Sequence, residues 1–241
     1  MNEPLMINSY PYLFASILMM LLCLIAGRLL LKTAQFWATV LSGLLNAPCC
    51  IFMPLLEKCY WSPKRVGGWI LGPEDLLISF AVALMAWFIV ALLLRGKISF
   101  ASTTPGFFRR YNTAAGLSVG FFLVFHFSGL EPMASLILTC GVMAILLQII
   151  RRDLWPLALC GFLGFPLLYL LVVRLDFWLC PDFILQWNRD SVWGVTFLGF
   201  PLGEITWSIV FGAYWPLFFS YTFMVEVAPS RKDARTCVAA A

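Results

Sequence analysis

The stretch LLISFAVALMAWFIVALLL, residues 76–94, decides the fold, because its nineteen residues include no charged side chain. A helix of about 20 apolar residues crosses the ~30 Å hydrocarbon layer of a bilayer. Six more stretches approach this length and composition: residues 11–31, 36–56, 113–130, 133–150, 156–173 and 201–222. Backbone in lipid must satisfy its own hydrogen bonds, so each span is expected to be helical. The sequence predicts an all-α polytopic membrane protein of about seven transmembrane helices, with residues 1–241 forming one integral domain.

Composition supports this class. Of 241 residues, 62% are hydrophobic and 12% are charged, whereas soluble domains carry about 25% charged residues. These values exclude a nucleic-acid-binding module and an ordinary soluble enzyme. We therefore expect the protein to be surrounded by membrane lipids and to have no nucleic-acid partner. Other membrane proteins could be partners.

The basic residues predict an orientation. With seven spans, eleven of the sixteen Lys and Arg residues fall on one side of the membrane. These eleven are Arg28, Lys32, Arg95, Lys97, Arg109, Arg110, Arg151, Arg152, Arg231, Lys232 and Arg235. Because basic loops stay in the cytoplasm, we expect a multi-pass protein of the cell (inner) membrane with its N-terminus outside and its C-terminus cytoplasmic.

The eight cysteines show no metal-binding spacing, so a metal site is not expected. Cys59 and Cys180 both fall in predicted outer loops. They could form a disulfide, although connectivity cannot be read from sequence.

One internal similarity links two loops to the helices that follow them. GGWILG at residues 67–72 precedes Pro73, Glu74 and Asp75, and GVTFLG at residues 194–199 precedes Pro201 and Glu204. Each copy reads as a glycine-bounded loop, a proline, an acid and a helix. Because four predicted spans separate the copies, both enter the membrane from the same side and could face one another.

The acids in these copies have two interpretations. Acidic residues in a first helical turn interact favourably with the helix dipole, which would explain Glu74 and Asp75 without any chemistry. Glu204 belongs to a segment with no other charge until Glu226. An ionisable residue inside a span is a candidate functional residue.

Aromatic residues accompany the acids. Trp207, Phe211 and Tyr214 follow Glu204 at helical spacing, while Trp69 and Trp193 lie in the two outer loops. An aromatic belt at the membrane interface explains the loop tryptophans. The residues after Glu204 run deeper, so they could instead form walls whose ring faces stabilise a positive charge.

The two segments, residues 60–91 and 182–219, resemble the tandem repeats of the lycopene cyclase domain family. That family begins a helix with a P-x-E-E-type motif after a glycine-containing loop. Gly72-Pro73-Glu74-Asp75 is similar to it with the proline moved by one place, and Pro201-Leu202-Gly203-Glu204 has glycine in place of the first acid. The resemblance implies a membrane carotenoid cyclase that needs no cofactor and acts on a lipid-soluble polyene.

On that resemblance, the enzyme would be an intramolecular lyase that forms an ionone ring in a linear C40 hydrocarbon such as lycopene, without net redox change. Glu74, Asp75 and Glu204 would share the acid and base roles. The expected substrate-binding residues are Trp69, Trp193, Trp207, Phe211 and Tyr214.

Three other functions stay open. A non-catalytic subunit of the same fold that binds a carotenoid or a lipid is the main alternative. A prenyltransferase would need paired acids for Mg²⁺, and Asp176, Asp182 and Asp190, expected in an outer loop, lack helical spacing. A transporter would need more polar groups in mid-membrane.

Overall fold

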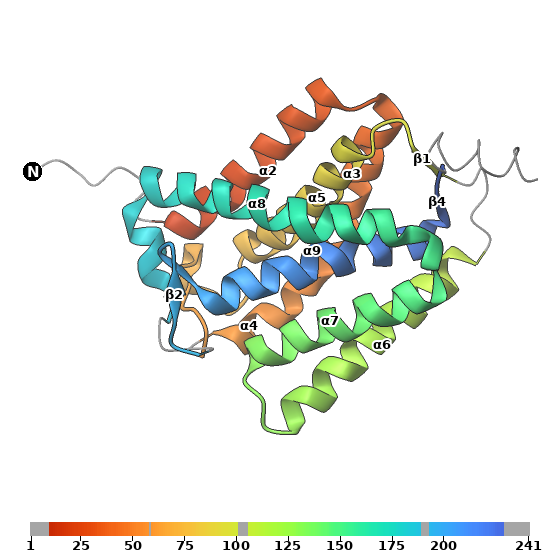
Figure 1. Ribbon diagram of the computed structural model, residues 1–241. Coiled ribbons are helices and arrows are strands. Elements are labelled where there is room, and N and C mark those ends of the chain that lie inside the picture. Colours follow the sequence, from red (N-terminus) through yellow and green to blue (C-terminus); the bar gives the residue numbers. More distant parts are fainter. Residues whose placement is uncertain (1–9, 58, 101–105, 189–192, 229–241) are drawn as a thin grey trace, which may run out of the picture.

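The computed structural model describes residues 10–57, 59–100, 106–188 and 193–228. Helices account for 78% of them. Five helical stretches are long and apolar enough to cross a membrane: Pro11–Leu30, Thr33–Leu56, Pro73–Leu93, Pro132–Ile150 and Arg152–Leu179. The prediction of a mostly helical protein with the character of a membrane protein is therefore confirmed at this level (Figure 1).

All seven predicted spans coincide with helical segments, although their bounds differ. The long helices are α2 (Pro11–Leu30), α3 (Thr33–Asn46), α5 (Pro73–Leu93), α6 (Phe107–Phe127), α7 (Pro132–Ile150), α8 (Trp155–Leu179) and α9 (Leu202–Phe223). Short elements complete the chain: η1 (Ala47–Phe52), α4 (Met53–Leu56), η2 (Val66–Gly68), β1 (Ile98–Phe100), η3 (Arg152–Leu154), η4 (Pro181–Gln186), β2 (Thr196–Phe197), β3 (Phe200–Pro201) and β4 (Val225–Val227). Helices α6 and α9 are not among the five candidate spans, because α6 carries two arginines and α9 carries Glu204 and many Trp, Tyr and Ser residues.

Hydrogen bonds show which helix ends meet. At one end, the Arg110 side chain donates to the Thr222 carbonyl, Arg151 donates to the Val225 carbonyl, and β1 pairs antiparallel with β4. At the other end, the backbone N–H of Ser62 donates to the Gln186 carbonyl, which joins the loop after α4 to η4. The long helices thus run up and down between two ends of one bundle (Figure 1).

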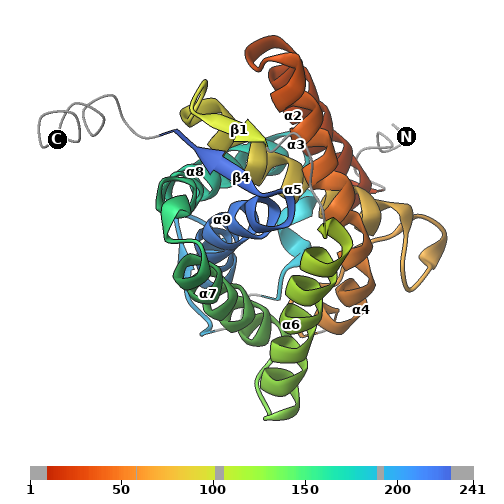
Figure 2. The same cartoon turned by 90° about the vertical axis from the view of Figure 1, so that its right-hand side faces the viewer.

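Helices α5 and α9 are the inner helices. Viewed along the bundle, α9 lies among α5, α7 and α8, while α2 and α3 cover the outer side of α5 (Figure 2). Eight residues of α5 from Ala81 to Ala91 are completely buried. Small side chains there let four neighbouring helices pack against α5 at once.

The closest helix contact joins α8 to α9. A Cβ atom added to Gly161 would lie 1.9 Å from the carbonyl oxygen of Gly212, so only glycine permits this approach. Small residues at such a crossing are typical of helix pairs in membranes.

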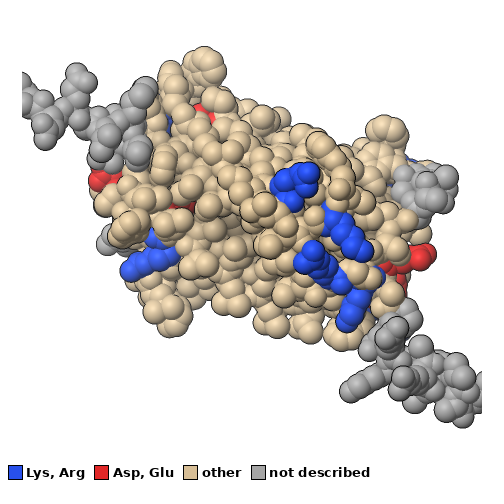
Figure 3. Space-filling view, turned by 90° about the horizontal axis from the view of Figure 1, so that it is seen from above, with Lys and Arg blue, Asp and Glu red and all other residues tan. Residues whose placement is uncertain are grey.

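Charged side chains are unevenly placed on the surface. On the face in Figure 3, most visible Lys and Arg atoms lie in the half that contains β1 and β4, the middle of the face is uncharged, and the opposite end shows some basic and acidic atoms. Arg231, Lys232 and Arg235, which contributed to the predicted orientation, lie outside the described residues.

Four sequence expectations need correction or refinement. The prediction of helices alone missed two small antiparallel strand pairs, β1–β4 and β2–β3. Cys59 and Cys180 do not form a disulfide with each other, and Cys59 is exposed whereas Cys180 is buried. Asp176 belongs to α8 rather than to an outer loop, because α8 extends to Leu179. The second predicted span changes at Asn46 from an α-helix to a 3-10 helix that contains Pro48.

Candidate functional site

The two acids that the repeat singles out occupy equivalent helical positions. Asp75 is the third residue of α5, and Glu204 is the third residue of α9. Gly203 therefore occupies the position that Glu74 has in α5. Both acids are buried, with 0% of Asp75 and 5% of Glu204 exposed.

Asp75 belongs to a buried ion pair. Its Oδ2 atom accepts hydrogen bonds from Arg65 Nε at 2.6 Å and from the backbone N–H of Gly72 at 2.7 Å. Its Oδ1 atom accepts from Tyr12 at 2.9 Å and from a second Arg65 nitrogen at 3.3 Å. Both carboxylate oxygens are thus occupied, and the bond from Gly72 helps to fix the start of α5.

Arg65 also contacts Glu57, with 2.9 Å between Nη1 and Oε2. Burial lowers the pKa of the Arg65 guanidinium, but its hydrogen bonds to Asp75 and Glu57 outweigh burial and raise this pKa above its ordinary value. Arg65 therefore stays charged and compensates the charge of Asp75.

Glu74 faces the same loop. Its Oε1 atom accepts from the backbone N–H of Val66 at 2.6 Å, and its Oε2 atom has no partner among the described residues. Glu74 is completely buried beside Gly72, where an added Cβ would lie 2.7 Å from Oε2. Its side chain is bound by loop backbone, and Glu74 lines neither of the cavities described below.

Glu204 has a different environment. Its Oε2 atom accepts from the Tyr60 hydroxyl and, at 3.3 Å, from Trp187 Nε1, while its Oε1 atom accepts from the Tyr169 hydroxyl. All three donors are neutral. Within the described part of the chain, no Lys or Arg side chain bonds to this carboxyl.

Neutral partners allow two protonation states. Tyrosine hydroxyls can donate to a carboxylate and can also accept from a carboxylic acid. The cluster can therefore hydrogen-bond Glu204 with or without its proton, whereas the Arg65 guanidinium beside Asp75 can only donate hydrogen bonds. This difference makes Glu204 the better candidate for proton transfer.

Glu204 lines a cavity of about 90 Å³, which we call the carboxyl cavity. Its wall includes Tyr60, Tyr169, Trp187 and Trp207. Asp75 does not line it and is linked to it only through Tyr12, which lines the cavity and bonds to Asp75. Of these two acids, Glu204 lines one of the two cavities described here and Asp75 lines neither.

A larger cavity, which we call the main cavity, measures about 170 Å³. One water molecule needs about 10–15 Å³ in this measure, so the main cavity has room for a chain of many carbon atoms. The two cavities have five lining residues in common: Met53, Leu56, Val82, Leu136 and Trp207. They are therefore adjacent, with Trp207 on the wall of both.

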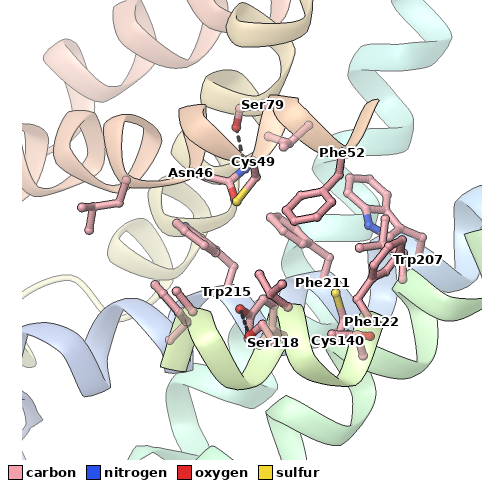
Figure 4. A pocket seen from close by; sticks show the side chains of 18 of the residues that line it. Asn46, Cys49, Phe52, Ser79, Ser118, Phe122, Cys140, Trp207, Phe211 and Trp215 are labelled. Atoms are coloured by element: carbon pink, nitrogen blue, oxygen red, sulfur yellow. Dashed lines mark hydrogen bonds between the residues drawn. The ribbon is translucent and has the colours of Figure 1, made fainter. Parts of the chain in front are cut away.

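Aromatic rings form one wall of this combined space (Figure 4). Trp207 stacks on Phe211 with ring centroids 5.0 Å apart, and Phe211 stacks on Trp215 at 5.9 Å. Tyr169 meets Trp207 edge to face at 5.5 Å. A stripe of ring faces thus runs from the carboxyl of Glu204 into the main cavity.

The structure brings together three of the five expected substrate-binding residues. Trp207, Phe211 and Tyr214 line the main cavity. Trp69 and Trp193 line neither cavity and are 65% and 59% exposed. The interface-belt interpretation fits these two residues better.

Sequence analysis missed the partners of Glu204. Tyr60 precedes the first glycine loop, Tyr169 lies in an apolar span, and Trp187 is one of several loop tryptophans. A tyrosine within an apolar span is a weak signal of a buried polar partner. Asp176 was also undervalued, because it is completely buried and neither carboxylate oxygen has a partner among the described residues.

Comparisons with known proteins return no match: no family model, no curated protein and no solved structure is similar to this chain. Among the described residues, no group of three or more His, Cys, Asp and Glu side chains could hold a metal ion. The geometry alone must therefore support a function.

Proposed function

We propose that the protein is a membrane carotenoid cyclase of the lycopene type, in which Glu204 transfers the protons. One observation carries the proposal. A buried carboxyl with only neutral hydrogen-bond partners lies beside an apolar, aromatic-walled space that is large enough for a hydrocarbon chain.

The reaction conserves atoms and electrons. The Glu204 carboxyl gives its proton to a terminal C=C bond of a linear polyene, which leaves a carboxylate and a tertiary carbocation. A neighbouring C=C bond attacks the cation, so that a C–C bond closes the ring and a new cation forms within it. Loss of a ring proton to the carboxylate then creates the ring double bond and restores the acid. One carboxyl can perform both transfers, so no cofactor is needed.

The surroundings of Glu204 suit this chemistry. Trp207 and Phe211 present ring faces, and a cation over such a face is stabilised. Tyr60 and Tyr169 can hydrogen-bond to Glu204 before and after it loses its proton. The apolar walls exclude water, which would otherwise trap the cation as an alcohol.

The test is expression in cells that accumulate lycopene, followed by pigment analysis. We expect wild-type protein to produce ring-containing carotenoids and Glu204→Gln to reduce them about 10²–10⁴-fold, which is the typical contribution of an acid–base residue. Asp75→Asn should retain ring formation in any protein that reaches the membrane, because Asp75 lines neither cavity. Cyclisation by Glu204→Gln at the wild-type rate would contradict the assignment.

A non-catalytic carotenoid- or lipid-binding subunit is the second candidate. In the second copy, Gly203 takes the position that Glu74 has in the first copy. In the first copy, Asp75 is bound by Arg65. Of the three acids in the two copies, Glu204 alone lines either of the two cavities. If wild-type protein co-purifies with an unchanged polyene and never forms rings, this second function replaces the first.

We also propose seven membrane spans with the N-terminus outside. The up-and-down course of seven helices and the basic residues at the β1–β4 end support this topology. Reporter fusions after Ile150 and after Thr222 should both report the cytoplasm. An extracytoplasmic signal from either fusion would contradict it.

A further inference from the structure

Asn46 is a polar side chain of the main cavity with unfilled hydrogen-bonding capacity. It is the last residue of α3, is only 6% exposed and lines the main cavity. Its amide nitrogen donates to the backbone carbonyl of Ser79 on α5 at 2.7 Å. No hydrogen bond reaches its carbonyl oxygen from any residue that the structure describes.

The orientation of this amide follows from its partner. The carbonyl of Ser79 can only accept, so the nitrogen of Asn46 must face it. The oxygen of Asn46 is then left on the other side of the amide group. Figure 4 shows it beside Cys49, on the side of the cavity opposite Ser118. A buried acceptor without a donor is unfavourable, so a donor from a ligand is expected there.

Ser79 Oγ and Trp207 Nε1, in two other residues of the cavity, also have no partner among the described residues, but both atoms are covered by protein. The remaining hydroxyl groups of the cavity are already paired. Ser118 and Tyr214 bond to each other at 2.9 Å, and Ser118 also donates to the Ala114 carbonyl at 2.8 Å. Thr139 donates to the Ser135 carbonyl at 2.7 Å. Asn46 is therefore the strongest place in the cavity for a hydrogen bond to a ligand.

We propose that Asn46 binds the hydroxyl group of an apolar ligand, so that the cavity accepts an oxygenated isoprenoid chain as well as a hydrocarbon such as lycopene. The hydroxyl donates to Asn46 Oδ1, and the carbon chain extends through the main cavity past Trp207 toward Glu204. This inference deepens the proposed function and rests on it for the isoprenoid class, but it is tested by binding rather than by turnover.

The experiment compares two probes on protein in lipid nanodiscs. Geranylgeraniol carries a terminal hydroxyl, and its methyl ether keeps the oxygen and loses the donor. Binding is followed by the fluorescence of the tryptophans, of which Trp207 and Trp215 line the main cavity. Because one net hydrogen bond is at stake, we expect wild-type protein to prefer the alcohol about 2- to 10-fold. Equal affinities for wild-type protein would overturn the proposal without any variant.

Three variants test which residue causes the preference for the alcohol over the ether. Asn46→Leu has a similar volume and no acceptor, so the preference should fall to about that of bilayers without protein. Thr39→Val is the matched control, because Thr39 is a buried polar residue of α3 that does not line the cavity, and it should keep the preference. Tyr214→Phe should also keep it. If Tyr214→Phe removes the preference and Asn46→Leu does not, the hydroxyl binds at the Ser118–Tyr214 pair and the assignment is wrong.

The outcome is separable from that of the cyclase proposal. Glu204→Gln should bind geranylgeraniol with the wild-type preference over the ether, because Glu204 does not line the main cavity. Absence of ring formation together with an intact preference rejects the cyclase and keeps the Asn46 site. Ring formation together with no preference rejects the Asn46 site and keeps the cyclase.

Discussion

Asp75 and Glu204 occupy the same place in two helices but have opposite surroundings. Asp75 bonds to a guanidinium, a tyrosine and a backbone N–H, and it lines no cavity. Glu204 bonds to two tyrosines and a tryptophan, and it borders an apolar space. Local sequence therefore determines that each acid lies in the first turn of its helix. The residues packed around the acid determine whether it stabilises the fold or remains available for chemistry.

The largest effect on stability should come from breaking the charged cluster. Arg65→Met leaves Asp75 buried without its cation, and loss of one partner of a buried ion pair costs about 3–5 kcal/mol. The side chains of Arg65 and Asp75 are 3% and 0% exposed, so solvent cannot compensate. The free energy of unfolding in mixed detergent and SDS micelles measures this loss. Arg174→Met, at an exposed arginine of α8, is the control and should change stability little.

Removing one hydroxyl beside Glu204 should cost less. Tyr169→Phe deletes the donor to Oε1 and leaves a buried carboxyl oxygen without a partner, at about 1–3 kcal/mol. If the cyclase proposal is correct, the same variant should also form rings more slowly. Tyr214→Phe is the matched control, since Tyr214 bonds to Ser118 instead. An effect of Tyr214→Phe as large as that of Tyr169→Phe would show that the loss does not depend on Glu204.

Glu204→Gln should cost still less stability, within about 1 kcal/mol. The amide can accept from one tyrosine through its oxygen and donate to the other through its nitrogen, and no ion pair is lost. Asp75→Asn should be clearly more destabilising, because it leaves Arg65 with Glu57 alone as its anionic partner. Thermal unfolding of the two variants in the same detergent compares them directly, and equal losses would contradict the distinction drawn between the two sites.

The sequence was sufficient to predict the helical bundle and the position of the acids. Apolar runs of span length required helices, and the paired Gly-Pro-acid pattern marked the starts of α5 and α9. The sequence could not show that Asp75 and Glu204 have different surroundings. Arg65 lies only 10 residues from Asp75, but Tyr60 lies 144 residues from Glu204. The Tyr60 contact depends on how the loop after α4 packs against α9, and single-residue patterns carry no record of packing.

The smallest effect is expected at Asp176, a third buried acid that differs from both others. Its carboxylate oxygens have no partner among the described residues, so replacing them removes no hydrogen bond. An unpaired carboxylate is costly to bury, whereas an amide of the same shape is never charged. Asp176→Asn should therefore either raise the free energy of unfolding or lower it by no more than about 0.5 kcal/mol. That is the usual range for substitutions that remove no specific interaction. Asp75→Asn, measured alongside, is the matched comparison. A loss at Asp176 as large as that at Asp75 would mean that this carboxyl binds a group that the described residues do not supply, which would make it a site in its own right.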